Sequence, residues 1–103
     1  MERCRQEMKI YIDYQDTINK ARELENLAGK LRLAADQKIG GTQTSLAASW
    51  TGDSAEAFRT KLAARQTKIR SRAEDLEKTA KALRRAAENM KRAEDAARAI
   101  LGF

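Results

Sequence analysis

The sequence predicts an all-α protein, a two-helix antiparallel hairpin, from three observations. The 103 residues include no proline and no valine and are rich in alanine and charged side chains, a composition typical of long helices. Apolar residues recur at helical spacing on both sides of the midpoint. Between the two periodic segments lies a stretch of turn and helix-start residues, SWTGDSAEAF, at 49–58. We therefore expect a single domain over residues 1–103, with a first helix at about 3–50, a turn at 51–53 and a second helix at about 53–100.

The first periodic segment carries one apolar stripe with alternating steps of four and three residues, as a helix buried along one face requires. Its members are Ile10, Tyr14, Thr17, Ala21, Leu24, Ala28, Leu31 and Ala35. The stripe then skips to Ile39, Thr42 and Leu46, an irregular step that resembles a stutter. Gly40 and Gly41 lie in this zone, and each costs a helix about 1 kcal/mol relative to alanine. We expect a kink, a frayed turn or a break there.

The second segment has a stricter repeat of seven residues. Its main row is Ala55, Leu62, Ile69, Leu76, Leu83, Met90 and Ala97. A second row, four residues beyond members of the first, is Ala73, Ala80, Ala87 and Leu101. Small side chains in that row would let another helix approach closely. We predict that the core or dimer seam contains Leu24, Leu31, Phe58, Leu62, Ile69, Leu76 and Leu83.

The turn between the segments is predicted from its own residues. Asp53 and Glu56 have the spacing of a capping box that starts the second helix. Gly52 precedes them at a position where the chain needs a positive φ, which glycine adopts without steric cost. Trp50 lies at the last turn of the first helix, where it either covers the end of the apolar seam or contributes to a surface read by a partner.

The stretch LAASWTGDSAEAF resembles the signature of the WXG100 family, the early secreted antigenic target-like proteins of type VII secretion. The family's Trp-X-Gly is here Trp50, Thr51 and Gly52, and the length of about a hundred residues also agrees. The resemblance implies an antiparallel dimer of hairpins, a four-helix bundle. It also implies export of the folded protein from a cytoplasmic pool without signal cleavage. A two-helix core is thin, which independently favours a dimer.

The resemblance also indicates partners. Many relatives carry a C-terminal export signal, a tyrosine followed four residues later by an acid, but no tyrosine follows Tyr14 here. A second pattern of apolar residues around an acid fits Met90, Glu94, Ala97 and Leu101, which either form a recognition element or continue the core stripe. A related hairpin in a heterodimer, instead of a second copy in a homodimer, would supply the missing signal. The secretion machinery and a larger exported toxin, for which this chain would be a targeting chaperone, are the other expected partners.

Several function classes are disfavoured by composition. The chain has no histidine, one cysteine, Cys4, and no glycine-rich phosphate loop, so we expect no enzyme activity, no cofactor and no metal site. The N-terminal stretch has no uninterrupted apolar run of a cleaved leader. No segment approaches the length of about 20 apolar residues that a membrane span needs.

A basic helical nucleic-acid-binding protein is the alternative from another class. The net charge is +6, and residues 51–103 hold thirteen of the bases and eight of the acids. Between Phe58 and Ala73 no acid interrupts Arg59, Lys61, Arg65, Lys68, Arg70 and Arg72. Such a run also suits a solvated face, an acidic protein partner or an anionic membrane. No aromatic side chains are interleaved for base stacking, which disfavours nucleic acid.

Overall fold

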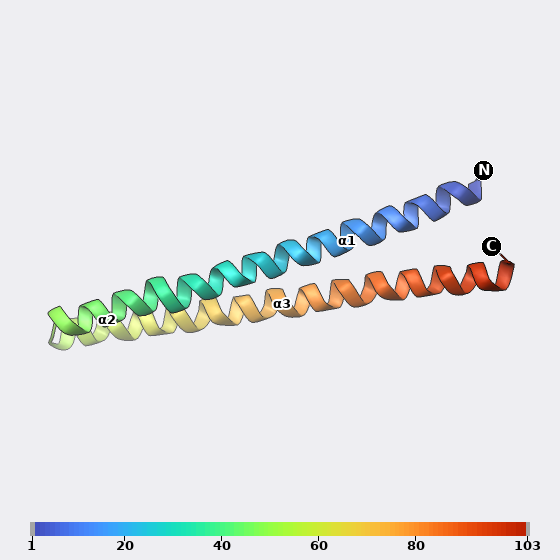
Figure 1. Cartoon of the computed structure of the whole chain (residues 1–103). Coiled ribbons are helices and arrows are strands. Elements are labelled where there is room, and N and C mark those ends of the chain that lie inside the picture. Colours follow the sequence, from blue (N-terminus) through green and yellow to red (C-terminus); the bar gives the residue numbers. More distant parts are fainter. Residues whose placement is uncertain (1, 103) are drawn as a thin grey trace. The chain divides into compact units, whose positions relative to one another are not determined.

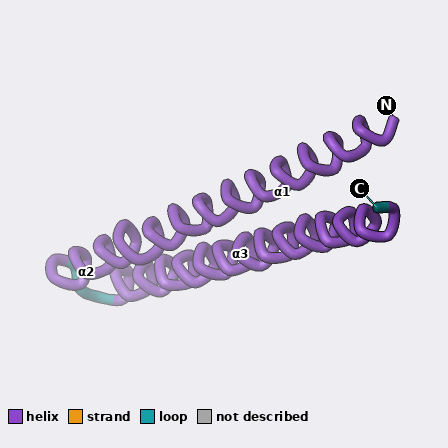
Figure 2. The backbone as a smooth tube through the Cα atoms, turned by 45° about the vertical axis from the view of Figure 1, so that its right-hand side comes forward, coloured by secondary structure: helices purple, strands orange, loops and turns teal. Residues whose placement is uncertain are grey.

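The chain is an all-α helical hairpin in a computed structural model, which describes the backbone of residues 2–102 and the side chains of residues 13–102. Cys4 lies outside the described side chains. The elements are α1 (Glu2–Leu33), the π-helical segment η1 (Ala34–Ile39), α2 (Gly40–Ser49) and α3 (Asp53–Leu101). Residues 50–52 form the loop between α2 and α3 (Figures 1 and 2). The predicted fold class is confirmed, with the reversal at the Trp-Thr-Gly stretch.

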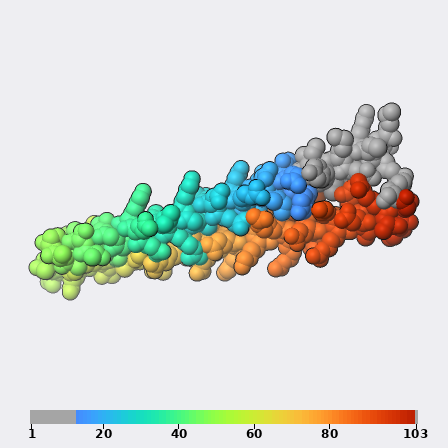
Figure 3. Space-filling view, viewed as in Figure 1, coloured from blue at the N-terminus to red at the C-terminus, as the bar shows by residue number. Residues whose placement is uncertain are grey.

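The molecule divides into two compact units. Residues 26–77 form the turn unit, and residues 1–25 together with 78–103 form the end unit. In the turn unit, the last part of α1, η1 and α2 run beside the first half of α3 (Figure 1). Figure 3 shows the helices of this unit in direct contact, with long side chains standing out into solvent. Each unit is therefore a pair of helices without a further covering layer.

The irregular zone of the first helical segment is a π-helix and not a break. A π-helix closes its hydrogen bonds from i to i+5, so it accommodates one more residue per turn than an α-helix. The extra residue lies where the apolar stripe takes two successive steps of four, from Leu31 to Ala35 to Ile39. Gly40 follows η1 in ordinary helical geometry, with φ −60° and ψ −42°. The expected disturbance thus takes the form of a π-helical segment that ends just before the glycine pair.

A contact from α3 supports the π-helical segment. The side-chain amide of Gln66 donates a hydrogen bond of 2.9 Å to the backbone carbonyl of Ala35. Buried carbonyls need such partners, and Ala35 itself has no exposed surface. Gln66 therefore joins η1 to α3 at the position where the helical repeat changes.

The core is a seam of alanines. Among the described side chains the buried residues are Ala21, Ala28, Ala35, Ala55, Ala73, Ala80 and Ala87, and no large side chain is fully buried. Each buried methyl contributes about 0.8 kcal/mol, whereas a fully buried leucine contributes about 1.5–3 kcal/mol. The close approach expected of the small-residue row therefore occurs within the hairpin, and it leaves the larger apolar side chains outside the seam.

Ion pairs fix the register on one side of this seam. In the turn unit, Arg32 Nε donates to Glu77 Oε1 at 2.7 Å, and Arg70 Nε donates to Asp36 Oδ1 at 2.9 Å. In the end unit, Arg84 Nε donates to Glu25 Oε1 at 2.9 Å. Half-exposed pairs of this kind contribute little to stability. Their main effect is to set the antiparallel pairing.

The register of the ion pairs also aligns buried alanines of the two helices. Counting from the Arg32–Glu77 pair, three residues forward on α1 and four back on α3 reach Ala35 and Ala73. Glu77, by its hydrogen bond and then by its charge, raises the pKa of Arg32 above its ordinary value. The raised pKa reflects the attraction between the two charges of the pair that lies beside these alanines.

The other side of the seam is apolar. On α3 the leucine and isoleucine row precedes the alanines by four residues, a rotation of about 40°. On α1, Leu24 and Leu31 follow Ala21 and Ala28 by three residues. Because the helices are antiparallel, both sets lie opposite the ion pairs. We call this half-buried set the apolar flank: Leu31, Leu62, Ile69 and Leu76 in the turn unit, and Leu24 and Leu83 in the end unit.

Candidate functional site

The first candidate site is the turn. α2 ends at Ser49, and Trp50 has extended backbone geometry, with φ −137° and ψ 121°. Its N–H donates to the carbonyl of Leu46 at 2.8 Å. The indole packs against Phe58 with ring centroids 5.7 Å apart and a tilt of 46°. Trp50 remains 39% exposed and Phe58 42% exposed, so the two rings form a surface cluster and not a buried plug.

The start of α3 differs from the predicted capping box. The N–H of Glu56 donates to the carbonyl of Gly52 at 3.0 Å, so Gly52 takes the cap position and Asp53 is the first helical residue. Neither the Asp53 nor the Glu56 side chain has a hydrogen-bond partner among residues 13–102. Both carboxylates lie in the first turn of α3, where they interact favourably with the positive end of the helix dipole.

Gly52 has a φ of +111°, which an L-amino acid with a Cβ adopts only with strain. We expect Gly52→Ala to destabilise the hairpin by about 1 kcal/mol or more. Gly41→Ala is the matched control, because Gly41 lies inside α2 with no atom near a new Cβ. That change should stabilise the protein by up to about 1 kcal/mol. Thermal unfolding followed by circular dichroism tests both; equal shifts in Tm would contradict the strain at Gly52.

The second candidate site is the C-terminal part of α3. Met90, Ala97 and Leu101 are exposed there, and Glu94 is half-buried. A carboxylate oxygen of Glu94 lies 3.6 Å from Arg98 Nη2. The structure thus leaves three of the four predicted recognition residues accessible to a partner and places the acid, about two turns before Leu101, in an ion pair with Arg98.

Sequence reasoning missed one member of this site. Ile100 is 84% exposed, the most exposed of the large apolar side chains described. It lies beside Leu101 but outside both seven-residue rows, so periodicity gave no reason to select it. Large apolar side chains without cover are a mark of interaction surfaces.

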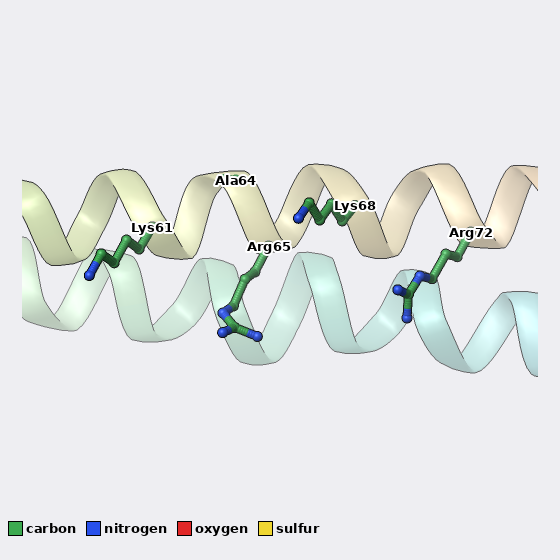
Figure 4. A pocket seen from close by; sticks show the side chains of 5 residues that line it. All are labelled: Lys61, Ala64, Arg65, Lys68 and Arg72. Atoms are coloured by element: carbon green, nitrogen blue, oxygen red, sulfur yellow. The ribbon is translucent and has the colours of Figure 1, made fainter.

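The third candidate site is basic. Lys61, Ala64, Arg65, Lys68 and Arg72 line a shallow groove of about 450 Å³ on α3. In Figure 4 their long side chains leave α3 on one side of the helix, with Ala64 between Lys61 and Lys68. Arg70, from the same acid-free run, instead pairs with Asp36. Of the six cations of the predicted run, four therefore line the groove, Arg70 is paired, and Arg59 belongs to neither set. The place of Ala64 in the groove was not predicted.

We also searched the described residues for metal sites and for membrane-spanning helices. Residues 13–102 hold no group of three histidine, cysteine or acidic side chains arranged for a metal ion. Across the helices that the structure describes, none is long and apolar enough to cross a membrane. The three sites are thus surfaces formed by aromatic, apolar and basic side chains.

Comparison with known proteins gives one match. The model of the WXG100 family, described as proteins of 100 residues with WXG, matches residues 9–95. No curated protein and no solved structure matches the chain. The matched range includes Trp50, Thr51 and Gly52 and covers most of both helical arms of the hairpin.

Proposed function

The chain belongs to the WXG100 family of small helical proteins of type VII secretion, and from this premise we propose that it is a non-enzymatic secretion substrate or adaptor that acts as a dimer. Its partner is a second copy or a related hairpin, and two hairpins pack antiparallel into a four-helix bundle. The protein is held in the cytoplasm before export and leaves by the type VII route without cleavage of a signal.

The composition of the core carries this proposal. Within residues 13–102 the buried side chains are all alanines, whereas the larger side chains of the apolar flank are half-buried. A second hairpin laid along that flank would remove leucine and isoleucine surface from water at about 25 cal/mol per Å². Four-helix bundles obtain their cores by this kind of packing. The ion-paired side of the seam offers no comparable apolar surface.

A targeting chaperone for a larger exported protein is the second candidate. The exposed Met90, Ile100 and Leu101 at the end of α3 favour it, because a chaperone needs an apolar surface that remains open after dimerisation. The half-buried Glu94 supplies an acid within the same surface. This role and the substrate role differ in whether a larger protein leaves the cell with the hairpin.

Two measurements test the proposal: the mass of the protein in solution and its export into the medium. Light scattering at micromolar concentration should give twice the chain mass of 11.6 kDa for a homodimer, or a stable complex after co-expression with a neighbouring hairpin. In a native host, the tagged protein should reach the medium and fail to do so without the secretion ATPase. A single-chain mass under both conditions would contradict dimer formation, and ATPase-independent export would contradict the route.

A further inference from the structure

The unassigned feature of the turn unit is the basic groove on α3. Lys61, Arg65, Lys68 and Arg72 follow one another at steps of four, three and four residues, which places them on one face of a helix. Eleven residues at a rise of 1.5 Å give a row about 17 Å long. We call these four cations the basic strip. We propose that the basic strip docks an acidic helical segment of another protein.

The basic strip forms no ion pair with the side chains of residues 13–102, whereas Arg32, Arg70 and Arg84 each form one. Residues 57–73 of α3 contain no acid, and residues 39–52 on the facing arm contain no charged residue of either sign. Asp36, three residues before that arm, is already paired with Arg70, and Asp53 and Glu56 lie in the first turn of α3, before the strip. The four cations are therefore open to carboxylates of another molecule.

The shape of the groove suits carboxylates at helical spacing. Ala64 is the small floor residue between long cationic side chains (Figure 4). Guanidinium groups bind carboxylates in a planar, two-pronged geometry, and the strip presents two of them with a lysine before each. An opposing helix with acids at i, i+4, i+7 and i+11 repeats the same spacing, so each carboxylate meets a cation without bending either helix.

The surroundings of the strip favour a helix over the alternatives. Leu62 and Ile69 of the apolar flank lie next to it on α3, about 60° away from Arg65 and Arg72. An amphipathic segment can meet the cations with its acids and place its apolar side at the edge of this flank, beside the second hairpin of the proposed dimer. A nucleic acid has no such apolar face, and no aromatic side chain within residues 59–72 is present to stack on bases. A second copy of this chain brings +6 and a strip of its own.

The test uses the full chain and a designed probe. The probe is a fluorescein-labelled helical peptide with glutamates at the matching four-three-four spacing and leucines on the adjacent face. A peptide of the same composition in scrambled order is its comparison. At about 150 mM salt, where charges are screened beyond about 8 Å, anisotropy should show that the patterned peptide binds about tenfold tighter or more.

Two variants locate the binding. K61Q/R65Q/K68Q/R72Q should weaken binding of the patterned peptide about tenfold. The matched control, K78Q/K81Q/R85Q/R92Q, removes the same charge from exposed positions on the same helix and should change the affinity less than about threefold. Ala64→Glu places a carboxylate in the groove and should weaken binding while the far-ultraviolet circular dichroism stays unchanged, because Ala64 is exposed.

Several results would overturn the proposal. The first is that the wild-type protein binds the scrambled peptide as tightly as the patterned one. The second is that the control variant loses as much affinity for the patterned peptide as the strip variant does. The third is that the strip variant binds the patterned peptide with wild-type affinity. A duplex DNA of about 20 base pairs, or vesicles of phosphatidylcholine with about one third phosphatidylglycerol, would reassign the strip if bound more tightly than the peptide and lost in the strip variant. A solution mass that falls to one chain in the strip variant would place the strip in the dimer interface. Loss of peptide binding with the wild-type mass retained separates this inference from the dimer proposal.

Discussion

Leu76→Glu should convert the proposed dimer into single folded hairpins. Leu76 lies in the apolar flank of the turn unit, where it is half-buried in one hairpin and would be covered by the second. A carboxylate at that position would lose its water on association without gaining a partner, which costs several kcal/mol. Every 1.4 kcal/mol is tenfold in affinity, so we expect the dissociation constant to rise about a hundredfold or more. Sedimentation equilibrium over a range of concentrations measures it.

Thr67→Glu is the control for this experiment. It introduces the same charge into the same unit, at an exposed position whose hydroxyl bonds only to the carbonyl of Ala63. Its dissociation constant should stay within about threefold of the wild type, since exposed charges interact weakly. Circular dichroism establishes that both variants remain helical. A wild-type dissociation constant for Leu76→Glu, or equal weakening in Thr67→Glu, would show that the dimer does not use the apolar flank.

Ala73→Leu should strongly destabilise the hairpin itself. Ala73 has no exposed surface and lies level with Ala35 in the register set by Arg32 and Glu77. Three additional carbon atoms in a seam of methyl groups would force the two backbones apart. Overpacking of this kind costs about 1–3 kcal/mol, and each kcal/mol lowers Tm by about 4–8 °C in a domain of this size. Thermal unfolding at fixed protein concentration measures the change.

The control for the alanine seam is Ala63→Leu. Ala63 is exposed on the same helix, and leucine is nearly as good a helix former as alanine. Its Tm should therefore stay close to that of the wild type. If Ala73→Leu unfolded at the same temperature as Ala63→Leu, the seam would have room for larger side chains, and the close approach of the helices would be wrong.

Sequence periodicity was sufficient for the fold class and for the place of reversal. The two long repeats end on either side of Trp50, and the structure turns between Ser49 and Asp53. Periodicity was not sufficient to decide which of two neighbouring rows faces the other helix. The rows of Ile69 and Ala73 differ by about 40° on the helix, so a heptad pattern fits both. In the structure the alanine row faces the other helix, and the ion pairs between distant residues lie on one side of it.

The candidate sites were predictable to different extents. The basic run is visible in the sequence. Which of its cations is paired is not, because Asp36 lies 34 residues before Arg70 and meets it only in the folded hairpin. The capping box was misplaced by one position, because the start of a helix depends on backbone geometry at Gly52 that residue types alone do not fix. Ile100 lies outside both rows, so the spacing that selected the rows passed over it, and its exposure is seen only in the folded hairpin.

The π-helical segment η1 has a consequence for how the length of this arm can vary. One additional residue per turn delays the rotation of all that follows by about 100° relative to an uninterrupted α-helix. The orientation of Leu46 and Trp50 about the arm's axis is therefore set by η1, upstream of the turn. Loss of a single residue between Ala34 and Ile39 would remove the extra residue together with the delay that it causes, so the resulting unbroken α-helix would keep the indole pointing in the same direction. Insertions and deletions in this arm are compatible with the same aromatic surface only when they preserve that angular phase.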